Sequence, residues 1–334
     1  MVPTRLDAQA LPPPPGIIGS IRAGFDAITA HIGLILMPLA LDLLLWLGPR
    51  VSIDKLMQPV MDEMGRLAPS AGLSAADMQS MIDMYADLLG RFNLLVALRT
   101  LPVGVSSLMS GRMPVISPLG LPAILQVESL GQLMGLFLLL TLLGWLLGGL
   151  YFYRVAGLVL PRPLTEALPT AGRAVVQTIL CSLIWAALFW TLGVPALFII
   201  YVSFAINSVL GQGLLLFLGF AALWLLVPLF FSPHGIYVRK QNAFASFLGG
   251  FQLTRLTLPS SSMFVLVVFL VGFGLNLLWV VPAEDSWLAL VGVLGHAFIT
   301  TALLAASFIY YREMSTWLQA VLERLSSGLP AQRA

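Results

Sequence analysis

The chain has 334 residues and a net charge of +2; 59% of its residues are hydrophobic and only 10% are charged. So small a net charge, with no basic run interleaved with aromatic residues, argues against a nucleic-acid partner. The single cysteine, Cys181, excludes an intrachain disulfide, a cysteine-based zinc site and a cysteine-ligated iron–sulfur cluster. A mean hydropathy of +0.95 indicates a polytopic integral membrane protein.

The N-terminal segment, residues 1–16, is polar and rich in proline. No cleavage pattern follows it, so we expect the apolar run that begins near residue 31 to be retained as a membrane span. Between the two, the segment 17–30 has the spacing of an amphipathic helix that lies in the membrane interface. Its apolar face consists of Ile17, Ile21, Phe25 and Ile28.

Six apolar segments meet or approach the roughly 20 residues that a helix needs to cross about 30 Å of hydrocarbon. They cover about 31–48, 132–154, 174–194, 212–232, 262–282 and 287–311. The predicted fold is therefore all-α: a single membrane domain over 17–334 with six transmembrane helices in three hairpins. Amphipathic segments introduce the hairpins at 17–30, about 164–173 and Gln241–Leu256, and another follows the last span over about Arg312–Leu325.

The long insertion between the first two spans, 49–127, is the one substantial element predicted outside the membrane. Val51–Leu67 and Ser74–Leu98 both have the pattern of amphipathic helices, and Ser74 is a candidate N-cap. The segment Leu101–Pro122 that follows is too apolar for a solvated linker. We expect it to lie against the outer face of the membrane, so that the insertion forms a helical cap.

The orientation follows from the short basic segments, which all fall on one side of the predicted membrane. They carry Arg5, Arg22, Arg154, Arg162, Arg173, Arg239, Lys240, Arg255, Arg312, Arg324 and Arg333. The short loops between spans three and four, and between spans five and six, contain no lysine or arginine. By the positive-inside rule, both termini are cytoplasmic in a multi-pass protein of the cell membrane.

Several motifs resemble a known group of membrane proteins. They are Pro233-His-Gly-Ile-Tyr-Val-Arg239, Ala243-Phe-Ala-Ser-Phe247 with Arg255, and Phe308-Ile-Tyr-Tyr-Arg312. In these the chain resembles bacterial six-span proteins of the glycerophosphodiester phosphodiesterase membrane-domain group. The opening Pro38–Trp46 with Gly48-Pro-Arg50 is similar to uncharacterised membrane proteins of filamentous anoxygenic bacteria. The resemblance implies a six-helix fold in the bacterial inner membrane and no activity, because the phosphodiesterase domain is a separate soluble barrel.

Small residues recur at four-residue spacing within the spans, at Gly131/Gly135, Gly144/Gly148 and Ala302/Ala306. Such faces allow helix backbones to approach closely in a bilayer. We therefore expect them at contacts between helices.

A polar cluster inside the membrane is the strongest candidate site. Asp42 lies within the first span, where a carboxylate costs about 2.5–3.5 kcal/mol on insertion scales and should face protein. Counting residues along the spans places three other polar side chains at comparable depth. The predicted cluster comprises Asp42, Thr141, Asn276 and His296. Its alternative roles are structural hydrogen bonds between helices, an ion or proton path, and a ligand pocket.

Metal and cofactor sites are weakly indicated. Methionines of the insertion form two helical faces, Met57, Met61 and Met64, and Met78, Met81 and Met84. Thioethers at such spacing can bind Cu(I), although methionine more often fills apolar contacts. His31 and His234 are not spaced with the deeper His296 as a pair of haem ligands, although a lone histidine could hold a haem or pigment. We predict no metal and no cofactor.

These patterns favour a non-enzymatic membrane protein that acts as a scaffold, accessory subunit or membrane-organising component. Its partners would be the lipid bilayer and another membrane protein, which would dock on an interfacial face formed by Phe244, Phe247 and Phe251. The alternative is a small transporter or channel that uses the polar cluster around Asp42 and His296. An intramembrane enzyme is the third alternative, because one carboxylate and one histidine provide few groups for catalysis.

Overall fold

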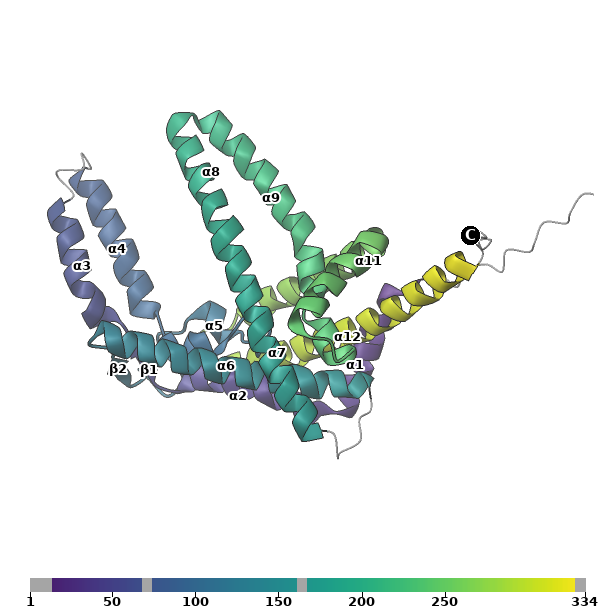
Figure 1. Cartoon of the computed structure of the whole chain (residues 1–334). Coiled ribbons are helices and arrows are strands. Elements are labelled where there is room, and N and C mark those ends of the chain that lie inside the picture. The colour runs from purple at the N-terminus through teal and green to yellow at the C-terminus, as the bar shows by residue number, and fades with distance from the viewer. Residues whose placement is uncertain (1–13, 68–73, 161–166, 328–334) are drawn as a thin grey trace, which may run out of the picture. The chain divides into compact units, whose positions relative to one another are not determined.

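The computed structural model describes residues 14–67, 74–160 and 167–327. Within these ranges nearly all regular structure is helical, which confirms the all-α prediction (Figure 1). The α-helices are α1 (Ile17–Ala30), α2 (Leu36–Leu47), α3 (Asp54–Leu67), α4 (Ala75–Arg91), α5 (Met109–Arg112), α6 (Leu130–Val159), α7 (Ala167–Leu188), α8 (Val194–Ile206), α9 (Ser208–Phe231), α10 (His234–Val238), α11 (Ala243–Trp279) and α12 (Ala289–Ser327). The described part also contains two short strands, β1 (Arg50–Ser52) and β2 (Ile124–Gln126), 3-10 turns at Ile32–Ile35 and Leu94–Leu98, and a π-helical turn at Phe189–Gly193.

The membrane-protein class is confirmed by the length and composition of the helices. Among the described residues, five helical segments are long and apolar enough to cross a bilayer, and the count rises to six if Ile17–Ala30 and Ile32–Leu47 form one span. The predicted first span, 31–48, is a 3-10 turn followed by the 12 residues of α2. At about 1.5 Å per residue, α2 alone is too short to cross the hydrocarbon core.

The third helical segment is longer than predicted. The sequence places the end of this span near residue 194, but α7 continues through a π-helical turn, Phe189–Gly193, into α8. Proline at position 195 lacks an N–H and would clash with the preceding turn of an α-helix, and a π-turn there accommodates it. The loop before α9 is thus reduced to Asn207, whose Oδ1 accepts from the backbone N–H groups of Val209 and Leu210.

Two predicted amphipathic segments are continuous with the spans beside them. The segment 241–256 forms the first part of α11, which is kinked at Thr257, where φ is −129°. Pro259 explains the kink, since it removes one helical hydrogen bond and restricts the residues before it. The segment 312–325 simply continues α12, because no glycine or proline interrupts it. Of the segment 164–173 and the N-terminal residues 1–16, positions 164–166 and 1–13 lie outside the described residues.

Contacts divide the chain into two compact units. Unit 1 consists of Met1–Ala30, Tyr153–Leu270 and Ala302–Ala334, and unit 2 consists of His31–Phe152 and Val271–Thr301. The helices α6, α11 and α12 contribute residues to both.

Aromatic residues form the centre of unit 1. Phe231 is fully buried and stacks on Phe264, Tyr310 and Tyr311, and the Phe264 and Tyr310 rings lie 4.1 Å apart. His234 Nε2 is 2.8 Å from the Ser307 hydroxyl. The Pro-His-Gly and Phe-Ile-Tyr-Tyr-Arg motifs therefore meet in the core of this unit.

The helix α1 is held in unit 1 by a seam of small residues. Its buried residues are Ser20, Gly24 and Ile28, rather than the whole predicted face of Ile17, Ile21, Phe25 and Ile28. A Cβ on Gly24 would lie 2.6 Å from the Ala302 carbonyl oxygen and 2.7 Å from the Ala306 Cβ. The close-packing prediction for Ala302 and Ala306 is confirmed. The prediction that α1 lies in the membrane interface is incomplete, because the small residues of this helix pack against α12.

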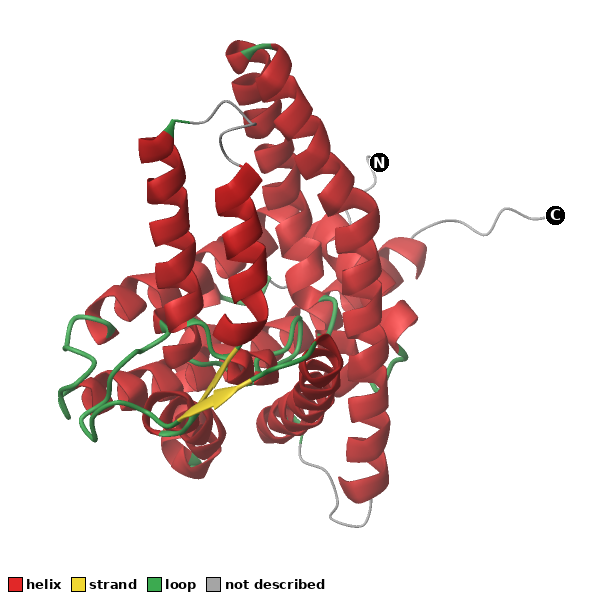
Figure 2. Ribbon diagram, turned by 90° about the vertical axis from the view of Figure 1, so that its left-hand side faces the viewer, coloured by secondary structure: helices red, strands yellow, loops and turns green. Residues whose placement is uncertain are grey.

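The insertion in unit 2 begins and ends in a two-stranded parallel sheet. Arg50, Val51 and Ser52 of β1 pair with Ile124, Leu125 and Gln126 of β2, and Figure 2 shows these strands among the connecting loops. Asn93 Oδ1 accepts hydrogen bonds from the N–H groups of Val51, at 3.0 Å, and Leu95, at 3.1 Å. Beyond the sheet, α3 and α4 form an antiparallel pair (Figure 1).

The chain that follows Leu98 packs against α6. A Cβ on Gly144, which lies halfway along α6, would be 2.5 Å from the Leu98 carbonyl oxygen. On Gly148 it would be 2.7 Å from the Gly104 Cα. The partner of this glycine pair is therefore the end of the 3-10 turn and the irregular backbone after it, rather than an α-helix. The sequence predicts that the segment 101–122 lies against the outer face of the membrane. The start of this segment instead lies against the middle of α6, because the two glycines leave room for it.

Candidate functional site

Asp42 is bound by the insertion. Its side chain, on α2, is fully buried within unit 2. Asp42 Oδ1 accepts from the Ser107 hydroxyl at 2.5 Å and from Met109 N at 2.9 Å, and Oδ2 accepts from Leu108 N at 3.1 Å. All three partners are donors, as a carboxylate requires.

The carboxylate occupies the N-terminal end of the short helix α5. The first N–H groups of a helix have no partner within it, and they carry partial positive charge. Here the Asp42 carboxylate satisfies two of them, and Ser107 Oγ accepts from Ser110 N at 3.0 Å. A side chain from one helix thus supplies the cap of another element that lies more than 60 residues later in the chain.

Arg99 places a positive charge beside this network. Its Nη1 donates to Ser110 Oγ at 2.9 Å, and its charge acts on both Asp42 and His296. Burial lowers the pKa of the Arg99 guanidinium from its usual value, and the negative charge of Asp42 opposes this change. An arginine stays protonated in proteins because its pKa begins so high, so Arg99 offsets the buried negative charge.

In the structure, the four residues of the predicted cluster do not share one set of hydrogen bonds. His296 Nδ1 lies 2.7 Å from Asn276 Oδ1, so these two side chains form a separate hydrogen bond between α12 and α11. In the described part of unit 2 no hydrogen bond joins Asp42 or Thr141 to that pair. Asp42 instead accepts from the Ser107 hydroxyl and from two backbone N–H groups of the insertion. Arg99 is the group whose charge acts on both Asp42 and His296.

A second set of polar contacts surrounds Ser106. The hydroxyl groups of Ser106 and Thr300 lie 2.7 Å apart, and Thr300 also donates to the His296 carbonyl oxygen at 2.7 Å. Tyr151 donates to Thr301 Oγ1 at 2.8 Å. The insertion therefore makes hydrogen bonds to α12 as well as to α2.

The last hairpin is tied to the insertion by a largely buried ion pair. Arg112 Nε and Glu284 Oε1 are 3.5 Å apart, with side chains 12% and 20% exposed. Arg112 Nη2 donates to the Pro282 carbonyl oxygen at 2.5 Å, and Trp46 Nε1 donates to the Glu284 carbonyl oxygen at 2.8 Å. Arg112 thus joins the second half of the insertion to the last hairpin within unit 2.

Glu284→Gln is expected to lower the free energy of unfolding by about 1–2 kcal/mol, because Arg112 then lacks its counter-charge in a poorly solvated place. Unfolding in an SDS titration of the purified protein in detergent micelles, followed by tryptophan fluorescence, measures the change. Glu128→Gln is the matched control, since the Lys55–Glu128 pair is 61% and 68% exposed. Its loss should cost less than about 0.5 kcal/mol. Equal effects of the two changes would contradict the role assigned to Glu284.

The remaining predicted residues lie apart from this network. In the predicted docking face, Phe244 is exposed, whereas the Phe247 and Phe251 rings are half-buried and 5.1 Å apart. The six methionines lie on α3 and α4, where Met78 is buried and Met84 is exposed. His31 is exposed and His234 is buried. In the part of the chain that the structure describes, no group of three or more His, Cys, Asp or Glu side chains could hold a metal ion. The docking face and the Cu(I) alternative stay predictions.

Sequence reasoning missed Ser107 and Arg99. The available signal was the run Val105-Ser-Ser-Leu-Met-Ser110, in which hydroxyl residues directly precede a helical turn and are typical of a helix start. Arg99 is a cation in an otherwise apolar stretch and therefore needs a partner.

Comparison of the chain with models of protein families, with curated proteins and with solved structures finds no match. The resemblance to the glycerophosphodiester phosphodiesterase membrane-domain group therefore stays a prediction.

Proposed function

We propose that the protein is a non-enzymatic membrane component that acts as a scaffold, accessory subunit or membrane-organising protein. The observation that carries the proposal is how Asp42 is used. A carboxylate at a membrane-buried position is costly and usually marks a function. Here its three hydrogen bonds join the insertion to α2. The role that we assign to this carboxylate is therefore structural.

The helices α8 and α9 support a role in docking. They form an antiparallel pair in unit 1 (Figure 1), and in the most apolar stretch of Pro169–Ile206 no residue is buried. Large side chains remain exposed along both helices, among them Phe198, Tyr201, Phe217, Phe220 and Trp224. In a bilayer, such a hairpin faces lipid or the helices of another membrane protein.

The placement in the membrane is part of the proposal. The basic residues of the chain support cytoplasmic termini and a multi-pass protein of the cell membrane. The face of Phe244, Phe247 and Phe251 would then lie at the inner interface as a second docking surface.

A small transporter or channel is the second candidate. Two observations favour it: irregular backbone near Gly104 lies against the middle of α6, and the N-terminal end of α5 faces a carboxylate. Transporters build midplane sites from broken helices whose N-termini face anionic groups. Irregular backbone at membrane depth is also tolerated where protein buries it, so the geometry alone does not require transport.

Site-specific photocrosslinking in living cells tests the scaffold proposal. A photoreactive residue at position 220, which is 71% exposed on α9, should give one discrete protein adduct. The matched control at position 231, which is fully buried in unit 1, should give none. Lipid adducts alone at position 220 would contradict docking through this hairpin.

Reconstitution into liposomes tests the second candidate. Proton or ion flux by the wild-type protein that is lost in a folded Asp42→Asn variant would favour transport over the scaffold role. A wild-type protein that conducts no more than empty liposomes supports the scaffold role.

A further inference from the structure

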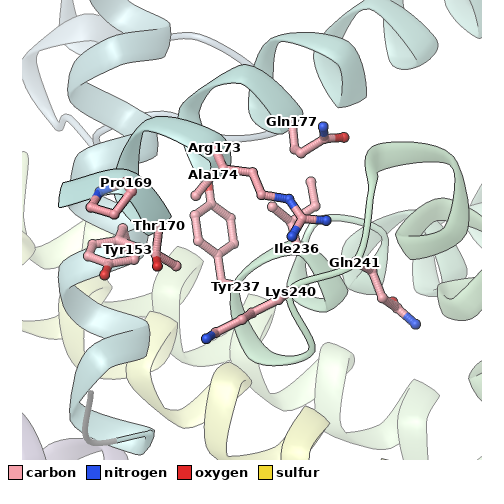
Figure 3. Close-up of a pocket in the computed structure, with 10 residues that line it drawn as sticks. All are labelled: Tyr153, Pro169, Thr170, Arg173, Ala174, Gln177, Ile236, Tyr237, Lys240 and Gln241. Atoms are coloured by element: carbon pink, nitrogen blue, oxygen red, sulfur yellow. The ribbon is translucent and has the colours of Figure 1, made fainter. Parts of the chain in front are cut away.

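A basic pocket lies within unit 1, far along the chain from Asp42. It is a cavity of about 270 Å³ formed where α6 ends, where α7 begins and where α10 leads into α11 (Figure 3). Its lining includes two cations, Arg173 and Lys240, and none of its ten lining residues is acidic. Ligand pockets begin at about 300 Å³, so the cavity suits a small group such as a headgroup rather than a whole lipid. The charge balance favours an anion.

The position of the pocket along the helices places it at a membrane boundary. Tyr153 lies near the end of α6, Arg173 near the start of α7, and Lys240 just after α10. These are the ends of segments long and apolar enough to cross the bilayer. Phosphate groups of lipids lie at this level, and basic pockets between transmembrane helices bind such groups.

The pocket is built from fixed parts. Tyr237 and Thr178 hydroxyl groups lie 2.5 Å apart and join α10 to α7. Gln177 Oε1 accepts from Ala243 N at 2.7 Å, which directs its donor NH₂ group away from that contact. In the view of Figure 3, the Arg173 guanidinium lies to the right of the Tyr237 ring and the Lys240 amine lies below that ring.

Lys240 has an unusual backbone conformation. Its φ is +51°, in the left-handed region that glycine adopts most readily. A lysine there keeps its charge at the pocket at some conformational cost, which is typical of functional positions.

The helix face that carries Arg173 continues as an apolar path. Val176, Leu180 and Leu183 follow at helical spacing on α7, and all three are exposed in unit 1. An acyl chain could lie along them while its phosphate occupies the pocket, which favours a lipid over a soluble ligand.

We propose that this pocket binds a phosphate group through Arg173 and Lys240. Two sources share this chemistry: the headgroup of an anionic phospholipid, which the apolar face of α7 favours, and a soluble phosphate ester. The site does not depend on the scaffold role, since it lies in unit 1 and uses none of the residues around Asp42.

Native mass spectrometry of the full chain in detergent micelles, titrated with phosphatidylglycerol or phosphatidylcholine, tests the site. The variant carries Arg173→Gln and Lys240→Gly, and the glycine suits the left-handed backbone, so that folding is preserved. We expect binding of phosphatidylglycerol to weaken about tenfold or more. The matched control is Arg255→Gln, which removes an exposed charge of α11 outside the pocket and should leave binding unchanged.

A competition with glycerol 3-phosphate distinguishes the two sources. If glycerol 3-phosphate leaves phosphatidylglycerol binding unchanged, the ligand of the pocket is a lipid. If it displaces phosphatidylglycerol from the wild-type protein but not from the pocket variant, the ligand is a soluble phosphate ester. Equal binding of the two lipids, or equal loss in the pocket variant and in Arg255→Gln, would overturn the proposal.

Discussion

Asp42→Ala is expected to lower the free energy of unfolding by about 3 kcal/mol or more, the largest effect of any single change considered. The substitution leaves the Ser107 hydroxyl and the N–H groups of Leu108 and Met109 without an acceptor. Each buried donor left without a partner costs about 1–3 kcal/mol, and Arg99 also loses the charge that balances it. An SDS titration in micelles, followed by tryptophan fluorescence, measures the loss.

Two graded variants make this result interpretable. Asp42→Asn keeps one acceptor oxygen but turns an NH₂ group toward a donor, so its cost should be smaller than that of Asp42→Ala. Ser107→Ala removes one of the three donors and should cost about 1–2 kcal/mol. If all three variants unfold within about 0.5 kcal/mol of the wild type, Asp42 does not hold the insertion.

Gly24→Leu is expected to cost about 3 kcal/mol, the second largest effect. A Cβ at this position would lie 2.6 Å from backbone atoms of Ala302 and Ala306, which cannot move aside as a flexible side chain would. Overpacking of a close contact costs about 1–3 kcal/mol, and a leucine places more than one atom there. The helix α1 should therefore separate from α12, and the same unfolding titration measures the loss.

Gly19 on the same helix is the matched control. No atom lies within 4 Å of a Cβ built there, so Gly19→Leu should be neutral or slightly stabilising through its better helix propensity. Destabilisation of equal size by the two changes would show that α1 responds to its composition rather than to its contact with α12.

The class of the fold was predictable from the sequence because it depends on apolar length alone. The helix boundaries were harder to predict where an amphipathic segment adjoins an apolar span. Polarity changes along α11 and α12, but no residue breaks α12, and Pro259 only kinks α11. Helix ends depend on such breaking residues rather than on the level at which a membrane would begin.

The sequence identified polar residues of the candidate site, but it did not identify the hydrogen-bond partners of Asp42. Asp42 stood out because a carboxylate in an apolar run demands a partner. Depth matching among spans suggested His296 and Asn276, and these two do bind each other. The method could not find the partner of Asp42, because that partner is largely backbone and backbone donors carry no signature in the sequence. Small residues gave a similar result. The spacing of Gly144 and Gly148 indicated a close contact, but not that its partner is irregular backbone rather than an α-helix.

The long-range bonds of unit 2 have a consequence for how the protein is made. Trp46 bonds to Glu284 across 238 positions of sequence, and Ser106 bonds to Thr300 across 194. When a ribosome has delivered the first half of the polypeptide, these donors and acceptors still lack their counterparts. Unit 2 can therefore reach its final packing only after the last hairpin has been synthesised.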